Sequence, residues 1–247
     1  MVKHFIASLF LILSSNYLSS QATPTPSMGP AGVFDRTDSR MMDAMRDLKN
    51  RRARKAAPPT GVKGSYYFNE KFQLSTVIYF DEILKDKAFL RYNAANDEIE
   101  MGNNVNQKDA EEVLLKSAKV NAIIDNEEYK LLPHRLKESN YPVIGYLVVL
   151  VDNEKYSLFL KRKKVFMKAV EARTSLDRSF PPRFVDDVSY YFSSNENTPI
   201  PLRVSKSNLR KISEENGSKV KNFIKENNIK IKSSEGLIKV FNFMNSL

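Results

Sequence analysis

The chain has 247 residues, of which 42% are hydrophobic and 28% are charged, and its formal net charge is +10. This composition is typical of a globular protein with one sizeable core and room for an extended tail. Because the chain has no cysteine, disulfide scaffolds, thiol redox sites and cysteine-ligated zinc or iron–sulfur sites are excluded.

The first 22 residues have the pattern of a secretory signal. Lys3 supplies a positive charge, residues 5–13 form an apolar run, and Ser20 and Ala22 are small residues of the kind that signal peptidase reads. This run is too short to cross a hydrocarbon core, which needs about 20 residues, and no later segment is long enough. We therefore expect a mature chain that begins at Thr23 and is periplasmic or secreted. The alternative is a buried N-terminal helix.

Charge is distributed unevenly along the rest of the chain. Residues 23–62 carry a net charge of +4, residues 63–204 are neutral, and residues 205–247 carry +5. Pro and Gly at both ends of residues 23–62 predict a largely disordered basic linker. Apolar residues at helical spacing within it indicate one of two structures. The first is a short basic helix that lies on an anionic surface, such as anionic envelope components, or docks on a partner. The second is a frayed, solvated helix. The candidate anion-binding patch consists of Arg51, Arg52, Arg54 and Lys55.

Residues 63–204 have the pattern of an antiparallel β domain. Short β-rich runs separated by polar turns predict strands over residues 75–80, 88–93, 98–101, 120–124, 128–132, 143–151, 156–167, 188–193 and 200–204. Turns of two to four residues join several of these runs and imply antiparallel neighbours. The long apolar run 143–151 is expected to be a central strand buried on both faces. Residues 107–116 are expected to form a helical interruption.

From Ser205 onwards the apolar spacing becomes helical. A first helix is expected to end near Asn216 and Gly217, a second has Ser218 as a candidate N-cap, and a third is capped by Ser233 or Ser234. The predicted fold is therefore α+β and mainly antiparallel β. A curved sheet or open half-barrel is formed by residues 63–204, and a C-terminal helical subdomain, residues 205–247, packs on it.

The sequence carries no phosphate-binding, nucleophile-elbow, zinc-protease or EF-hand motif. His134, the one histidine of the expected mature chain, is interpreted as structural. Acid pairs that could hydrolyse a glycosidic bond are Asp97 with Glu100 and Asp186 with Asp187, and no Ser–Lys pair is singled out. We assign no catalytic, cofactor-binding or metal-ligating residue and expect no cofactor.

The basic residues 161–164 have two interpretations. Residues 155–183 carry nine bases and two acids, whereas residues 97–154 carry twelve acids and six bases. If these stretches meet in a sheet, the cluster is a strand end compensated by acidic neighbours; otherwise it is an anion site. We favour compensation. The basic C-terminal helices carry no groove-reading motif, so no nucleic-acid partner is expected.

Four segments carry a resemblance to known sequences: residues 62–72 (VKGSYYFNEKF), 90–100 (LRYN and DEIE), 179–184 (SFPPRF) and the last fifteen residues. They resemble a group of uncharacterised exported proteins from Bacteroidetes-type bacteria over about residues 62–247. The resemblance implies an exported, sheet-rich domain with a helical end, and it implies no activity and no functional residue. Within the second segment, Arg91 is expected to pair with Glu98 or Glu100 across a hairpin.

These patterns together predict an exported, non-enzymatic protein that binds a ligand or is associated with the envelope. A first alternative is a periplasmic hydrolase that uses carboxylates or a Ser–Lys pair, and convergent carboxylates in an internal pocket would favour it. A second alternative is a carrier of a lipid-like ligand, and a wide apolar cavity inside the half-barrel would favour it.

Overall fold

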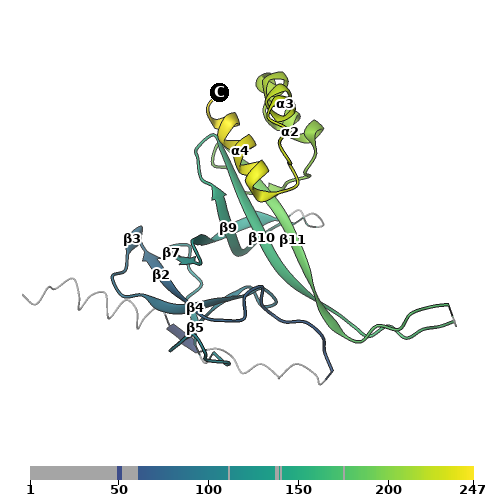
Figure 1. The fold of residues 1–247 in the computed structure, drawn as a ribbon. Coiled ribbons are helices and arrows are strands. Elements are labelled where there is room, and N and C mark those ends of the chain that lie inside the picture. Colours follow the sequence, from purple (N-terminus) through teal and green to yellow (C-terminus); the bar gives the residue numbers. More distant parts are fainter. Residues whose placement is uncertain (1–48, 52–60, 111, 137–138, 140, 175) are drawn as a thin grey trace, which may run out of the picture.

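A computed structural model describes residues 49–51, 61–110, 112–136, 139, 141–174 and 176–247. The expected signal and most of the expected linker lie outside these residues. In the described part, antiparallel strands form one curled half-barrel sheet, and helices lie at its C-terminal end (Figure 1). The predicted fold class is confirmed.

The strands are joined mostly by tight turns, so neighbours in sequence are often neighbours in the sheet. They are β1 (Lys49–Arg51), β2 (Gln73–Tyr79), β3 (Glu82–Ile83), β4 (Ala88–Asn93), β5 (Glu98–Gly102), β6 (Glu112–Leu114), β7 (Val120–Ile124), β8 (Glu127–Arg135), β9 (Pro142–Val151), β10 (Tyr156–Met167), β11 (Arg183–Ser194) and β12 (Ile200–Pro201). Their order in the sheet is β1-β6-β5-β4-β2-β7-β8-β9-β10-β11-β12, with β3 beside β2. Asp125 and Asn126, both at positive φ, form the expected turn between β7 and β8.

Alternating side chains of β10 serve different layers of the molecule. Leu158 packs under the C-terminal helices, and Leu160 belongs to the main core enclosed by the curled sheet. Phe159 points to the opposite face, where it packs with Leu147 and Tyr191. The central strand β9 shows the expected burial on both faces at residues 145–148, but its beginning is exposed.

The helical end consists of α2 (Lys206–Ile212), a 3₁₀ turn η1 (Glu214–Asn216), α3 (Gly217–Glu226) and α4 (Ser234–Asn245), and α4 contacts β9 and β10. The expected cap at Ser233 is confirmed, because its hydroxyl accepts a hydrogen bond from the N–H of Gly236 at 3.1 Å. Among the described residues, no helix is both long and apolar enough to span a membrane.

Two expectations about the helical end were wrong. Helix α3 begins at Gly217, where the sequence predicted the end of the preceding helix, and Ser218 is not its N-cap. The reason is a close approach between α2 and α3. A Cβ on Gly217 would lie 2.6 Å from the carbonyl oxygen of Arg210, so only glycine fits there.

The expected helix at residues 107–116 was also wrong, because Glu112–Leu114 forms strand β6, which lies between β1 and β5 in the sheet. Leu114 is buried in the main core, so tertiary packing overrides the local helical spacing. The last expected strand is shorter than predicted and ends at Pro201. In the expected linker, Lys49–Arg51 forms β1, which pairs with β6.

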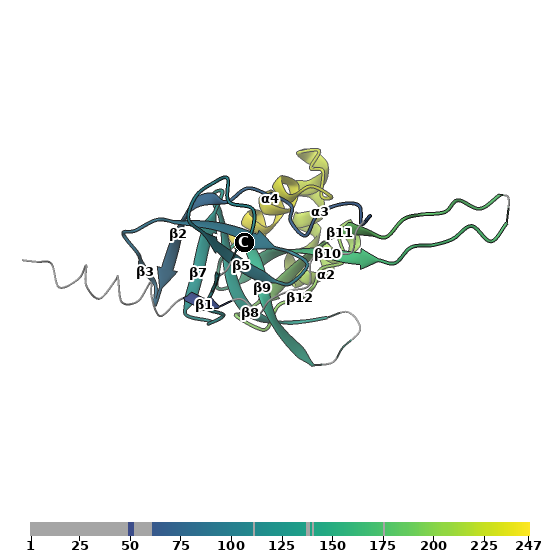
Figure 2. The same ribbon diagram turned by 90° about the horizontal axis from the view of Figure 1, so that it is seen from below.

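Strands β10 and β11 form a long ribbon that leaves the body of the protein. Their register is continuous from the pair Tyr156–Ser194 to the pair Met167–Arg183. Residues 168–174 and 176–182, which we call the arm, continue outwards from the ribbon and project away from the body in both views (Figures 1 and 2). Reciprocal backbone hydrogen bonds of 2.9 and 2.8 Å between Val170 and Phe180 join its two sides.

Candidate functional site

The basic cluster at residues 161–164 forms ion pairs within the chain. Three of its four side chains have acidic partners: Lys161 with Asp97, Arg162 with Glu127, and Lys164 with Asp186. These acids come from the β4–β5 turn, the start of β8 and strand β11, rather than from β9 across the hairpin. The interpretation that acidic neighbours compensate this basic cluster is therefore confirmed for these three side chains.

Around Gly145, ionisable side chains are packed closely together. A Cβ at this position would lie 2.4 Å from Asp97 Oδ2 and 3.0 Å from both Lys161 Nζ and His134 Cε1. Lys161 Nζ lies 2.8 Å from Asp97 Oδ1 and donates to the carbonyl oxygen of Tyr146 at 2.9 Å. Its donors are thus engaged inside the protein, and its side chain is 12% exposed.

Burial governs the ionisation of this cluster. Desolvation lowers the pKa of Lys161, although the adjacent Asp97 carboxylate opposes this. Desolvation also lowers the pKa of His134, and the positive charge of Lys161 acts in the same direction. His134 lies in β8, buried edge-on against the ring of Tyr191. These contacts support its structural role.

The hydroxyl groups of Tyr92 and Tyr146 differ in their partners. Tyr92 donates to Asp97 at 2.6 Å, and its pKa is raised by burial and by that carboxylate. The Tyr146 hydroxyl is buried without a hydrogen-bond partner among the described residues. Burial raises its pKa as well, so Tyr146 stays neutral.

Glu100 lies in a separate buried network. Arg91 Nη2 is 2.6 Å from Glu100 Oε2, and their side chains are 4% and 0% exposed. Tyr67 and Asn93 also donate to this carboxylate, at 3.0 and 2.7 Å. The expected pairing of Arg91 is confirmed with Glu100, whose register partner it is. The guanidinium also lies between two aromatic rings, 3.8 Å from that of Tyr67 and 4.2 Å from that of Phe72.

The sequence-predicted acid pairs do not form shared sites. Asp97 is bound to Lys161 while Glu100 is bound to Arg91. Asp186 and Asp187 are consecutive in β11, so their side chains point to opposite faces. Among the described residues, no group of three acidic or histidine side chains is placed to hold a metal ion.

The predicted anion-binding patch is only partly within the described chain. Arg51 is the last residue of β1, and Arg52, Arg54 and Lys55 lie outside the described residues. The patch stays a prediction.

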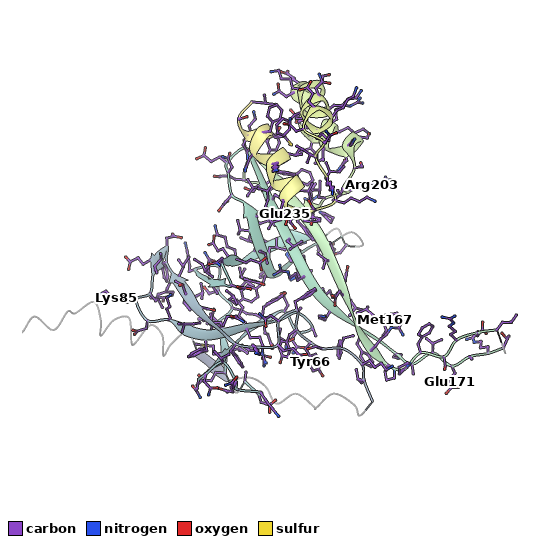
Figure 3. All side chains as sticks on the ribbon, in the orientation of Figure 1. Tyr66, Lys85, Met167, Glu171, Arg203 and Glu235 are labelled. Carbon is purple, nitrogen blue, oxygen red and sulfur yellow. The ribbon has the colours of Figure 1, made fainter. Side chains whose placement is uncertain are left out.

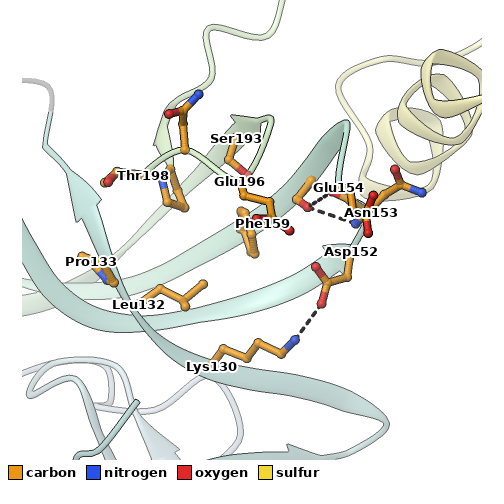
Figure 4. A pocket seen from close by; sticks show the side chains of 13 residues that line it. Lys130, Leu132, Pro133, Asp152, Asn153, Glu154, Phe159, Ser193, Glu196 and Thr198 are labelled. Carbon is orange, nitrogen blue, oxygen red and sulfur yellow. Dashed lines mark hydrogen bonds and ion pairs between the residues drawn. The ribbon is translucent and has the colours of Figure 1, made fainter. Parts of the chain in front are cut away.

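A groove of about 510 Å³ lies over the β8–β11 part of the sheet, on the face of Phe159 (Figure 4). Its apolar lining is formed by Leu132, Pro133, Phe159 and Pro199. The helices cover the opposite face of β10, where Leu158 packs. A pocket of this size is within the usual range for small ligands.

Both walls of the groove are fixed by hydrogen bonds. At the β9–β10 turn, the Ser157 hydroxyl donates to the carbonyl oxygen of Asn153 at 2.8 Å and accepts from its N–H at 3.0 Å. At the β11–β12 turn, the N–H of Arg135 donates to the carbonyl oxygen of Pro199 at 2.9 Å. The groove is therefore formed before any ligand binds.

Ser193 provides a polar group in this lining. Its side chain is 7% exposed, and its hydroxyl makes no hydrogen bond to any described residue. In Figure 4 it lies above Phe159, across from Lys130. Because this hydroxyl is not engaged within the chain, it can donate to or accept from a polar group of a ligand in the groove.

The rim of the groove carries three carboxylates and one ammonium group. Lys130 Nζ lies 2.6 Å from Asp152 Oδ2. Burial acts to lower the pKa of Lys130, but its hydrogen bond to Asp152 and the nearby Glu128 raise it overall. Glu154 and Glu196 form no ion pair with a described residue, so the rim keeps two unneutralised negative charges.

Sequence reasoning did not predict this groove. Its residues come from three separated segments, at 130–133, 152–159 and 193–199. The polar turns at 152–154 and 194–197 were the one local signal, and polar turns are common at strand ends.

Comparisons with known proteins gave no match: neither a protein-family model, nor a curated protein, nor a solved structure is similar to this chain. The functional assignment therefore rests on the chemistry of the groove and on the arm.

Proposed function

We propose that this chain is an exported, non-enzymatic binding protein and that the groove is its ligand site. The ligand combines three features: an apolar part over Phe159 and Leu132, a hydrogen-bonding group at Ser193, and a positive charge near Glu154 and Glu196. The observation that carries the proposal is an apolar groove in which the Ser193 hydroxyl makes no hydrogen bond to a described residue and so is open to a ligand.

The remaining ionisable groups support binding over catalysis. The Asp97–Lys161 and Arg91–Glu100 pairs are satisfied by internal partners, and neither pair lines the groove. The curled sheet encloses packed apolar side chains, including Val77, Ile99 and Leu131. This packing favours the groove over the half-barrel interior as the place for a ligand.

Dansylcadaverine tests the site, because this dye joins an apolar ring system to a primary amine. We expect its fluorescence to rise on binding to the wild-type protein. Ser193→Ala should weaken binding about two- to tenfold, as expected for loss of one hydrogen bond worth about 0.5–1.5 kcal/mol. Glu154→Gln and Glu196→Gln should each weaken it up to about fivefold, because exposed ion pairs contribute up to about 1 kcal/mol.

Ser157→Ala is the matched control for Ser193→Ala, because the two side chains are 6% and 7% exposed. The Ser157 hydroxyl is bonded within the chain, so its loss should lower the free energy of unfolding by about 0.5–1.5 kcal/mol. Ser193→Ala should leave that free energy unchanged. If Ser193→Ala destabilises the protein as much as Ser157→Ala and leaves dye binding intact, the proposal is wrong.

We further propose export, with cleavage before Thr23, on the basis of the signal pattern in residues 1–22. Sequencing the N-terminus of protein purified from the organism that makes it should give Thr23, or Gln21 if cleavage follows Ser20. An N-terminus at Met1 would contradict export by this route.

A further inference from the structure

We propose that the arm of one copy of this chain docks into the groove of a second copy, so that the protein associates head to tail. This inference rests on the proposed function of the groove and names its partner. It connects two features that lie apart in one chain, the projecting arm and the groove.

The tip of the arm presents an apolar side chain between two free cations. Leu176 is 94% exposed, the highest value among the exposed large hydrophobic residues. Arg173 and Arg178 flank it in sequence and are exposed, and neither guanidinium forms an ion pair or hydrogen bond with a described residue. The tip therefore has the apolar part and the positive charge that the groove is suited to bind.

The arm is ordered by its own hydrogen bonds. The Asp177 carboxylate accepts from the backbone N–H groups of Arg173 and Thr174, at 3.3 and 3.0 Å, and so closes the tip. At the base, the ring of Phe166 lies 5.3 Å from that of Phe184, which in turn lies 4.6 Å from that of Tyr66. Figure 3 shows Tyr66 on the body side of the arm and Glu171 partway along the arm. A preorganised arm loses less conformational entropy on docking than a flexible loop would.

The arm is too distant from the groove of its own chain. Phe159 lies in the groove, and the ribbon runs eight further residues to Met167, roughly 27 Å at the rise of an antiparallel strand. The arm continues outwards from there (Figure 1). The groove of a second copy is therefore the partner available to it.

The two surfaces are complementary in charge and in polarity. Leu176 would cover Phe159, and the two arginines would face Glu154 and Glu196 on the rim. A backbone group of the arm would bond the Ser193 hydroxyl. Because the arm and the groove are different surfaces, the interface is heterologous and builds chains or rings rather than an isologous dimer. The contact is small beside a standard interface of about 1,600 Å², so we expect reversible, concentration-dependent association.

Sedimentation velocity over a range of concentrations tests the proposal on protein purified from the organism that makes it. Leu176→Asp should weaken association by at least about 30-fold, the effect of removing a hot-spot side chain. Thr198→Trp, which fills the groove from its exposed wall, and Glu196→Lys should also weaken it. Leu247→Asp and Glu215→Lys are matched controls at exposed positions outside both surfaces and should associate like the wild type.

A mixing experiment then tests the head-to-tail arrangement. Leu176→Asp keeps an intact groove and Thr198→Trp keeps an intact arm, so the two variants, each monomeric alone, should form a one-to-one complex when mixed. The double variant Arg178→Glu/Glu196→Lys should likewise regain self-association, because the exchanged charges again attract each other.

The outcomes separate this inference from the proposed function. A wild-type protein that is monomeric at every concentration overturns the arm-in-groove contact, while groove-dependent dansylcadaverine binding would leave the proposed function standing. Association that is lost in Leu176→Asp but kept in Thr198→Trp and Glu196→Lys would show another acceptor for the arm and overturn the inference. A wild-type protein that stays monomeric and binds anionic phospholipid vesicles through Leu176 would also overturn the inference.

Discussion

The buried ion pair between Arg91 and Glu100 predicts a large stability effect. Arg91→Met removes the guanidinium from the fully buried Glu100 carboxylate, which still accepts from Tyr67 and Asn93. Removing one partner of a buried ion pair costs about 3–5 kcal/mol, since the other charge stays desolvated and uncompensated. That loss is a large part of the about 5–15 kcal/mol of a typical domain.

A double-mutant cycle isolates the pair. Arg91→Met combined with Glu100→Gln removes both charges and leaves an amide that still accepts from Tyr67 and Asn93. We therefore expect the double variant to be more stable than Arg91→Met alone, with a coupling energy of roughly 2 kcal/mol. Lys130→Met is the control, because Lys130 lies at the same 2.6 Å from Asp152 but the two side chains are 25% and 57% exposed. It should cost less than about 1 kcal/mol.

Urea unfolding followed by circular dichroism measures these differences, provided that the m-values agree between variants. The reasoning fails if Arg91→Met costs no more than Lys130→Met, or if the effects of Arg91→Met and Glu100→Gln add without coupling.

Three further predictions concern two tyrosine hydroxyls, His134 and the basic patch. Tyr146→Phe removes a buried hydroxyl that has no partner among the described residues, so it should leave the free energy of unfolding unchanged or higher. Tyr92→Phe removes a donor to Asp97 and should lower the free energy of unfolding by about 1.5–3 kcal/mol. Equal losses of the two variants in urea unfolding would contradict this. The pKa of His134 is lower in the folded protein than its ordinary 6.5, so the unfolded chain binds the proton first as the pH falls. The melting temperature should therefore fall as the pH drops below about 6.5, and it should fall less steeply in His134→Gln. An equal slope in both proteins would refute a contribution of His134 to this pH dependence. Replacing Arg51, Arg52, Arg54 and Lys55 with Gln should weaken low-salt retention on anionic vesicles, and retention that ignores salt would count against an electrostatic patch.

Local patterns in the sequence were sufficient to predict most of the sheet. The β-rich run of β10, the apolar run of β9 and the turn at Asp125 and Asn126 each lie within a short window, so they specify strands and a hairpin by themselves. The cap at Ser233 and the cross-strand pair of Arg91 with Glu100 depend on spacings of three and nine residues, which are also readable locally.

The errors arose where a distant part of the chain changed a local preference. Leu114 joins the main core as a strand residue because the edge of β5 offers unpaired backbone groups. A glycine stands at the start of α3 because the Arg210 carbonyl oxygen in α2 leaves no room for a Cβ there. In both places the packing partner lies outside the window that the pattern covers.

The groove and the projecting arm were decided by tertiary structure alone. Ser193 and Phe159 meet because β10 and β11 pair in one continuous register, and the β8 residue Leu132 joins them through β9. The chain separates these residues by 27 positions or more, and no local periodicity records which strands become neighbours. The arm projects because β9 pairs with β10 only up to Leu160, so the rest of the ribbon extends without that neighbour.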